Sequence, residues 1–241
     1  MDINSFWSEL EQRISKYDLL KHPFYTAWSR GELKKEDLCE YAVQYYPHVE
    51  AFPSYLEELE KRLPEGSTAR QAIAENRQDE LGSKSTSAIS HSDMWLDFAY
   101  GMGANKDLVK NTDSIPEIKQ LMSQFYDYAE RGKTVEALAA FYAYESQVPR
   151  ISDEKAAGLR DKYGADPKAC RYFAVHSVAD IEHANTWRKL ISHEIENDAN
   201  KMQQALNSAE KTAAALWKVL DGIMPLTSVQ AQGAESHCVT H

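Results

Sequence analysis

Helical periodicity runs through almost the whole sequence, and this pattern limits the fold more than any other feature. Apolar residues recur every three or four positions, as at Leu10, Ile14 and Tyr17, whereas the alternation typical of strands is nearly absent. Glycine and proline are scarce, with 10 and 8 among 241 residues, which disfavours the many turns of a β fold. The sequence therefore predicts an all-α protein.

The predicted helices follow one another without a long linker, an internal repeat or a shift in composition. Pro47 and Pro53 should kink one long helix and Pro149 should break another, because each proline removes a backbone donor. Small polar residues at 82–90 form the expected internal loop. We expect one domain over residues 1–224 and a frayed tail over 225–241, with helices at about residues 6–20, 23–30, 34–63, 67–81, 91–101, 118–130, 134–163, 167–197 and 201–223.

Charge and cysteine content indicate the kinds of partner and the cellular compartment that we expect for this protein. The formal net charge is −10, from 27 basic and 37 acidic residues, which argues against binding nucleic acid or an anionic membrane. No apolar run approaches the roughly 18 residues of a membrane span, and MDINSFWSEL lacks the features of a signal peptide. Cys39, Cys170 and Cys238 are far apart and odd in number, which favours a reducing compartment and packing roles. We therefore expect a cytoplasmic protein.

The pattern His176-x-x-x-Asp180-x-x-His183 is the strongest chemical signal in the chain. At 100° per residue, positions i, i+4 and i+7 of a helix lie within about 60° of one another, so the three side chains share one stripe. Tyr172 and Phe173 lie beside this stripe, which indicates a partly buried face. Burying two imidazoles and a carboxylate without partners is costly, and metal coordination is one way to offset the cost. A solvated polar stripe is the alternative interpretation.

Three further residues extend this set. Glu145 lies in the apolar segment FYAYESQVPR, where a buried glutamate needs a partner, either a metal or a cation such as Arg150. Glu80 and His91 flank the polar loop, where each alone would more often be solvated than a ligand. Helix bundles build paired-metal sites from such carboxylates and imidazoles, and the mixture suits iron or manganese better than structural zinc or magnesium. The combined set predicts two metal ions with open positions, as dioxygen binding requires.

Beyond these residues, long segments of the chain resemble the haem-oxygenase-like dinuclear metal oxidases, in particular the group of the Chlamydia protein associating with death domains (CADD-like proteins). The likeness covers about residues 6–220, and its specific segments are HPFYTAWSRGEL, YAVQYYPHVEAFPSYL, AFYAYESQVPRISDEKAAGL and FAVHSVADIEHA. It implies a single-domain bundle of about seven helices that binds no haem. It also implies six metal ligands, namely Glu80, His91, Glu145, His176, Asp180 and His183.

The resemblance further implies a self-sacrificing synthesis of p-aminobenzoate, a folate precursor. Tyr25 in HPFY matches the tyrosine that supplies the aromatic ring, and Lys155 in ISDEKAAGL matches the proposed amine donor. Tyr41 and Tyr144 match two further tyrosines of the family's site, as radical relays or alternative ring sources. The implied cofactors are two metal ions, Fe/Fe or Fe/Mn, with dioxygen as co-substrate and an external reductant. A homodimer is a possible assembly, since proteins of this fold often form dimers.

The residues alone would assign no role to the proposed ring and amine donors. Tyr25 is one of 13 tyrosines and could simply pack in a helix, and Lys155 could be a solvated lysine paired with Asp153 or Glu154. An amine can supply nitrogen only when neutral, so the proposed role requires Lys155 to be desolvated or close to cationic metals. Burial of Lys155 therefore separates the two interpretations.

One interval departs from the expected family pattern. Glu80 and His91 are eleven residues apart, longer than we expect, so residues 82–90 resemble an insertion. If the insertion displaces the ligands, Glu80 or His91 is the one affected, and Asp79 is a substitute for Glu80. The tail adds three metal-capable residues, His237, Cys238 and His241, for which adventitious binding is the expected role.

Three other functions compete with p-aminobenzoate synthesis. A dinuclear oxidase of the same fold that acts on an external small molecule would keep all six ligands. The metal-free relatives, pyrroloquinoline-quinone synthases and thiaminases, would not need them. A death-domain-type interaction protein needs no buried ligands either, and the chain contains no evident partner-binding segment.

Overall fold

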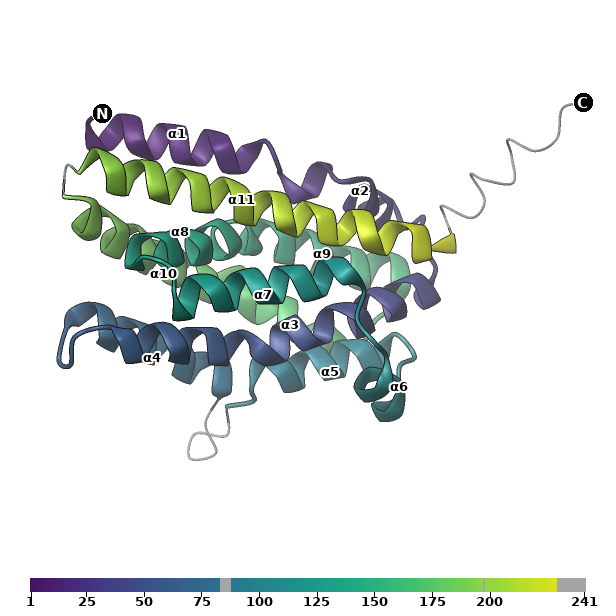
Figure 1. Ribbon diagram of the computed structural model, residues 1–241. Coiled ribbons are helices and arrows are strands. Elements are labelled where there is room, and N and C mark those ends of the chain that lie inside the picture. Colours follow the sequence, from purple (N-terminus) through teal and green to yellow (C-terminus); the bar gives the residue numbers. More distant parts are fainter. Residues whose placement is uncertain (83–87, 197, 229–241) are drawn as a thin grey trace, which may run out of the picture.

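Helices make up nearly all of the regular structure (Figure 1). The computed structural model describes residues 1–82, 88–196 and 198–228, and within these ranges it contains eleven α-helices, two 3-10 helices and no strand. The all-α prediction is confirmed, with more and shorter helices than the about seven expected. The α-helices are α1 (Ile3–Ser15), α2 (Pro23–Arg30), α3 (Lys35–Arg62), α4 (Thr68–Leu81), α5 (His91–Gly101), α6 (Lys106–Asn111), α7 (Pro116–Glu130), α8 (Thr134–Glu145), α9 (Val148–Tyr163), α10 (Pro167–Ile195) and α11 (Ala199–Ile223).

Local capping signals explain many helix boundaries. Pro23 opens α2 behind His22, whose Nδ1 accepts the Phe24 amide at 3.1 Å, and Gly31 ends the helix in the left-handed conformation. Asp166 caps α10 by accepting the Ala169 amide at 2.8 Å. The predicted break at Pro149 separates α8 from α9, whereas α3 continues through its two internal prolines.

Three segments differ from the prediction. The first helix ends at Ser15 instead of continuing to residue 20, and the Asp18 carboxylate caps a separate 3-10 helix, Leu19–Lys21. Helix α6 was not expected, because six residues are too few for a periodic pattern to be recognised. Residues 225–228 were placed in a frayed tail, yet Ser228 donates its amide and hydroxyl to the buried Asp37 carboxylate at 2.8 and 2.7 Å. The rest of that tail, with His237, Cys238 and His241, lies outside the described residues.

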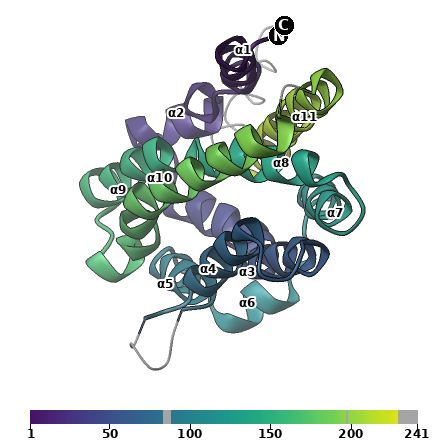
Figure 2. The same cartoon turned by 90° about the vertical axis from the view of Figure 1, so that its left-hand side faces the viewer.

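The packing of the helices places α10 at the centre of the chemistry. Helix α10 contacts α5, α8 and α9, while α3 contacts α4, α5 and α7. Helices α1 and α11 lie side by side along one edge of the bundle (Figure 1). In the end-on view, α8 and α10 lie between this pair and the group of α3, α4 and α5 (Figure 2). No helix in the described ranges is both long and apolar enough to cross a membrane.

Aromatic side chains fill the core between α2, α3, α5 and α10. The Trp95 ring lies against Tyr41, Tyr45 and Phe98, and its Nε1 donates to the Ala42 carbonyl at 2.8 Å, which joins α5 to α3. Such rings bury a large apolar area in fixed orientations. The polar residues described next lie beside this aromatic core and are themselves buried.

Candidate active site

The six predicted ligands come together as two groups of three, and all six are buried. Within each group the possible ligand atoms lie within 4.8 Å of one another. The groups are joined by α10, which supplies one residue to the first and two to the second, as the i, i+4, i+7 stripe predicted. The first group is Glu80, His91 and His176, and the second is Glu145, Asp180 and His183.

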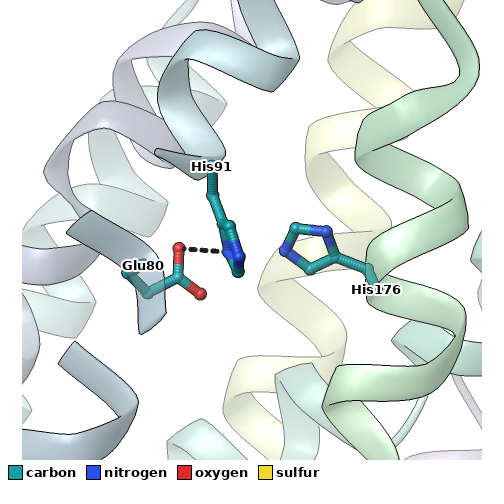
Figure 3. A group of neighbouring side chains, drawn as sticks. All are labelled: Glu80, His91 and His176. Carbon is teal, nitrogen blue, oxygen red and sulfur yellow. Dashed lines mark ion pairs between the residues drawn. The ribbon is translucent and has the colours of Figure 1, made fainter. Parts of the chain in front are cut away.

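The first group spans the gap between α4, α5 and α10 (Figure 3). Glu80 at the end of α4 lies with its Oε2 2.8 Å from Nδ1 of His91, the first residue of α5. The His176 ring faces them from α10, and its Nδ1 lies 2.7 Å from the carbonyl oxygen of Tyr172. Because that nitrogen donates to a carbonyl, the lone pair of His176 is on Nε2, the arrangement of a metal-binding imidazole.

The long interval between Glu80 and His91 does not separate them, because the backbone at residues 88–90 lies against Gly82, just after the end of α4. Gly82 has φ +66°, and a Cβ placed there would lie 2.6 Å from the Ala88 carbonyl and 2.7 Å from the Ser90 amide. Additional residues between 82 and 88 therefore leave the ends of α4 and α5 together. Glu80, and not its neighbour Asp79, is the buried carboxylate beside His91.

The second group joins the end of α8 to α10. His183 Nδ1 lies 3.1 Å from Asp180 Oδ1 and 3.7 Å from Glu145 Oε2. The Glu145 carboxylate also accepts hydrogen bonds from Trp187 Nε1 at 2.5 Å and from the Asn76 amide at 3.4 Å. Arg150, the alternative partner raised by the sequence, instead pairs with Asp18 at 2.8 Å.

The charges in this interior fit a pair of cations. Burial raises the pKa of Glu145 to about 8, and the carboxylates of Asp180 and Glu80 add to this effect. Burial lowers the pKa of His183, but Asp180, Glu145 and Glu80 outweigh it and raise the value to about 10. Asp180 Oδ2 is buried without a hydrogen-bond partner among the described residues. Three carboxylates in a dry interior, one with an unused oxygen, together with three imidazoles, form a donor set that suits iron or manganese.

The predicted ring and amine donors meet beside these two groups. Lys155 on α9 is buried, and its Nζ donates to the Tyr41 hydroxyl at 2.7 Å and lies 4.3 Å from the centre of the Tyr25 ring. The hydroxyls of Tyr25 and Tyr41 are 3.1 Å apart. Burial lowers the pKa of Lys155 well below its usual value, and no carboxylate of the described residues opposes this shift. The interpretation of Lys155 as a solvated lysine paired with Asp153 or Glu154 is therefore wrong.

A small cavity of about 30 Å³ lies beside these residues. Its wall includes Tyr25, Tyr41, Lys155 and Tyr144, which directly precedes the ligand Glu145. The cavity has room for about one water molecule. The four predicted catalytic side chains therefore line one space.

Sequence reasoning missed several residues that support the site. Asn76 and Trp187 bind Glu145, Tyr172 binds and stacks on His176, and Tyr45 stacks on Tyr41. Each of these four residues lies four positions from a predicted site residue on the same helix, a spacing that indicates the same helix face but not the partner that the side chain binds. These pairs are Asn76 with Glu80, Tyr172 with His176, Trp187 with His183 and Tyr45 with Tyr41.

Comparison with known proteins places this site in a family. A family model described as an iron-containing redox enzyme, of the haem-oxygenase-like class, matches residues 39–217. The chain belongs to this family. Two relatives named 4-aminobenzoate synthase, from Nitrosomonas europaea and Chlamydia trachomatis, are 34% and 32% identical to it. The first alignment covers 92% of this chain and 92% of the relative, and the second covers 91% and 92%.

The fold of this haem-oxygenase-like redox enzyme also matches solved structures. A CADD-like protein of unknown function from Nostoc punctiforme superposes with a TM-score of 0.70 at 19% identity, over 99% of this chain and 98% of that one. At this identity the likeness concerns the fold alone. It agrees with the haem-oxygenase-like architecture that the sequence segments predicted.

Proposed function

We propose that this enzyme is an oxygen-dependent p-aminobenzoate synthase that uses its own Tyr25 as the ring source and Lys155 as the amine donor. The name of its relatives, 4-aminobenzoate synthase, designates the same product. The six buried ligands would hold two metal ions, Fe/Fe or Fe/Mn, whose role when bound is to activate dioxygen with electrons from an external reductant. Tyr144 and Tyr41, which line the same cavity as Tyr25, are the candidate relay residues.

The observation that carries the proposal is the dry contact between the Lys155 amine and the Tyr25 ring. A buried lysine normally has a carboxylate partner, whereas this one has a tyrosine hydroxyl and aromatic faces. Because burial alone lowers the pKa of Lys155, its amine can be neutral and keep the lone pair that carbon–nitrogen bond formation needs. The Tyr41 hydroxyl contacts both the Lys155 amine and the Tyr25 hydroxyl, so a hydrogen-bond chain links the two proposed donors.

The carbon skeleton of the product agrees with this source. p-Aminobenzoate has one carbon outside its ring, which Tyr25 Cβ would supply as the carboxylate, and a nitrogen where tyrosine has its phenolic oxygen. The bond between Cα and Cβ of Tyr25 must therefore break, with dioxygen as the oxidant that converts Cβ to the carboxylate. Nitrogen must replace the phenolic oxygen, which leaves as water, and the bond between Cε and Nζ of Lys155 must break to release that nitrogen. These changes concern atoms of the chain itself, so each chain would react once unless its residues are restored.

The size of the cavity favours this reaction over oxidation of an external substrate. Small-molecule sites usually measure about 300–1,000 Å³. The space beside Tyr25 measures about 30 Å³ and is lined in large part by the protein's own aromatic rings. An aromatic ring is therefore already present at the site, as part of the chain.

The test combines metal analysis, intact mass and product detection. Reduced, metal-loaded wild-type protein should hold two metals, release p-aminobenzoate on exposure to dioxygen, and lose mass at Tyr25 and at the amine donor Lys155, but at no other tyrosine. Tyr25→Phe should give neither product nor mass change and should fail to rescue a p-aminobenzoate auxotroph. Tyr100→Phe, at an exposed tyrosine, is the matched control and should behave as wild type. Equal rescue by Tyr25→Phe would refute the role of Tyr25, and two metals without a mass change would indicate an external substrate.

A further inference from the structure

Asp79 is an exposed carboxylate that touches a buried ligand. It precedes Glu80 on α4, and 65% of its side chain is accessible to solvent. Its Oδ2 lies 3.4 Å from Nε2 of His183. The residue lines a surface groove of about 680 Å³ whose wall also includes His91 and Ala179. Asp79 therefore reaches the second ligand group from the solvent side, although the sequence suggested it as a substitute in the first group.

The two ring nitrogens of His183 have different neighbours. Nδ1 faces the other two members of its group, at 3.1 Å from Asp180 Oδ1 and 3.7 Å from Glu145 Oε2. Ligand atoms that share one metal ion at about 2.0–2.2 Å are themselves about 3–3.5 Å apart. Nδ1 thus has the spacing of a shared-ion ligand, and Nε2 points to Asp79 instead.

We propose that Asp79 is the positioning residue for the metal ligand His183. A neutral imidazole has one N–H and one lone pair, and a ligating nitrogen must have the lone pair. By accepting the Nε2–H, Asp79 would keep the lone pair on Nδ1 and hold the ring toward Asp180 and Glu145. Carboxylates that orient metal-binding histidines in this way typically change metal affinity about 10–100-fold when they are removed. This inference rests on the metal assignment in the proposed function and does not depend on the reaction of Tyr25.

The experiment measures Mn²⁺ binding to the full-length protein under anaerobic conditions, by titration and by electron paramagnetic resonance of free and bound Mn²⁺. Asp79→Ala should lower the affinity for one of the two Mn²⁺ ions by about 10–100-fold and leave the affinity for the other unchanged. The affinity of Asp79→Asn for this ion should lie between those of wild type and Asp79→Ala. The asparagine oxygen still accepts the Nε2–H of His183, but it has no charge. Glu182→Ala is the matched control, since it removes an exposed carboxylate next to His183 in the chain and should bind both ions as wild type.

Three results would overturn the positioning role. Two Mn²⁺ ions bound by Asp79→Ala with wild-type affinities would show that the contact does not orient His183. If Asp79→Ala lowered the affinities for both Mn²⁺ ions equally and also lowered the melting temperature of the metal-free protein, Asp79 would have a general structural role. A bound-Mn²⁺ spectrum in Asp79→Ala that indicates loss of an oxygen ligand would make Asp79 a direct ligand. Failure of wild-type protein to bind Mn²⁺ would instead refute the metal centre itself, which distinguishes the two proposals.

Discussion

Replacing Lys155 by methionine should stabilise the protein while it removes the proposed amine donor. Methionine has a similar length and no charge, so it can occupy the same apolar space between Tyr25, Tyr41 and Trp28. The variant loses the hydrogen bond from Lys155 to the Tyr41 hydroxyl, at a cost of about 0.5–1.5 kcal/mol. Tyr41 keeps its contact with the Tyr25 hydroxyl, so no polar group is left without a partner.

The size of the gain follows from the linkage between folding and proton binding. Burial lowers the pKa of Lys155 well below 10.5, so between the folded-state value and 10.5 the unfolded chain binds a proton that the folded chain lacks. Wild-type stability should therefore rise with pH in this window, by up to about 1.4 kcal/mol per pH unit relative to the variant. The advantage of the methionine variant is largest at the low end of the window and disappears as the pH approaches 10.5.

Urea unfolding of the metal-free proteins between pH 7 and 9 measures this difference directly. Other groups titrate in both proteins, so the pH dependence of the difference in unfolding free energy isolates Lys155. A change of about 2 kcal/mol would shift the melting temperature by about 4–8 °C in a protein of this size. Lys106→Met, at an exposed lysine, should show no such dependence. A pH-independent difference between wild type and Lys155→Met would refute the claim that burial alone controls this amine.

Two other substitutions test the supports of the site. Gly158→Ala on α9 places a Cβ 2.7 Å from the Trp28 ring. This overpacking should lower the unfolding free energy by about 1–3 kcal/mol and reduce the product yield by displacing Lys155. Unchanged unfolding and an unchanged yield would contradict this expectation. Trp187→Phe removes the indole N–H that binds Glu145, so thermal unfolding should show a loss of about 1–3 kcal/mol, whereas an unchanged melting temperature would mean that Asn76 suffices as a partner.

Features governed by neighbouring residues were predictable from the sequence. The stripe of His176, Asp180 and His183 follows from helix geometry alone, and the boundaries of α2 and α9 follow from Pro23, Gly31 and Pro149. These are local effects, so a single sequence contains them. The grouping of Glu145 with Asp180 and His183 could be expected only through the family resemblance, because it depends on how α8 packs on α10.

Features governed by distant contacts were not predictable. No local pattern indicates that Trp187 donates to Glu145, or that Ser228 binds Asp37 and so orders the first residues of the expected tail. The convergence of the chain at Gly82 is another case. A longer interval between two ligands indicates displacement only if the extra residues move the helix ends, and the backbone contact of Gly82 with residues 88–90 prevents this.

The close packing around Tyr25 has a consequence for the lifetime of the protein. Its ring lies against Phe24, Trp28 and Tyr41 in the core, where loss of an aromatic side chain typically costs about 3–5 kcal/mol. That loss is a large part of the stability of an ordinary domain, about 5–15 kcal/mol. Under the proposed reaction, a chain that has released its product would therefore unfold more often than a fresh one and be removed first by proteases. The same contacts that hold the ring for reaction would thus mark the used molecules for replacement.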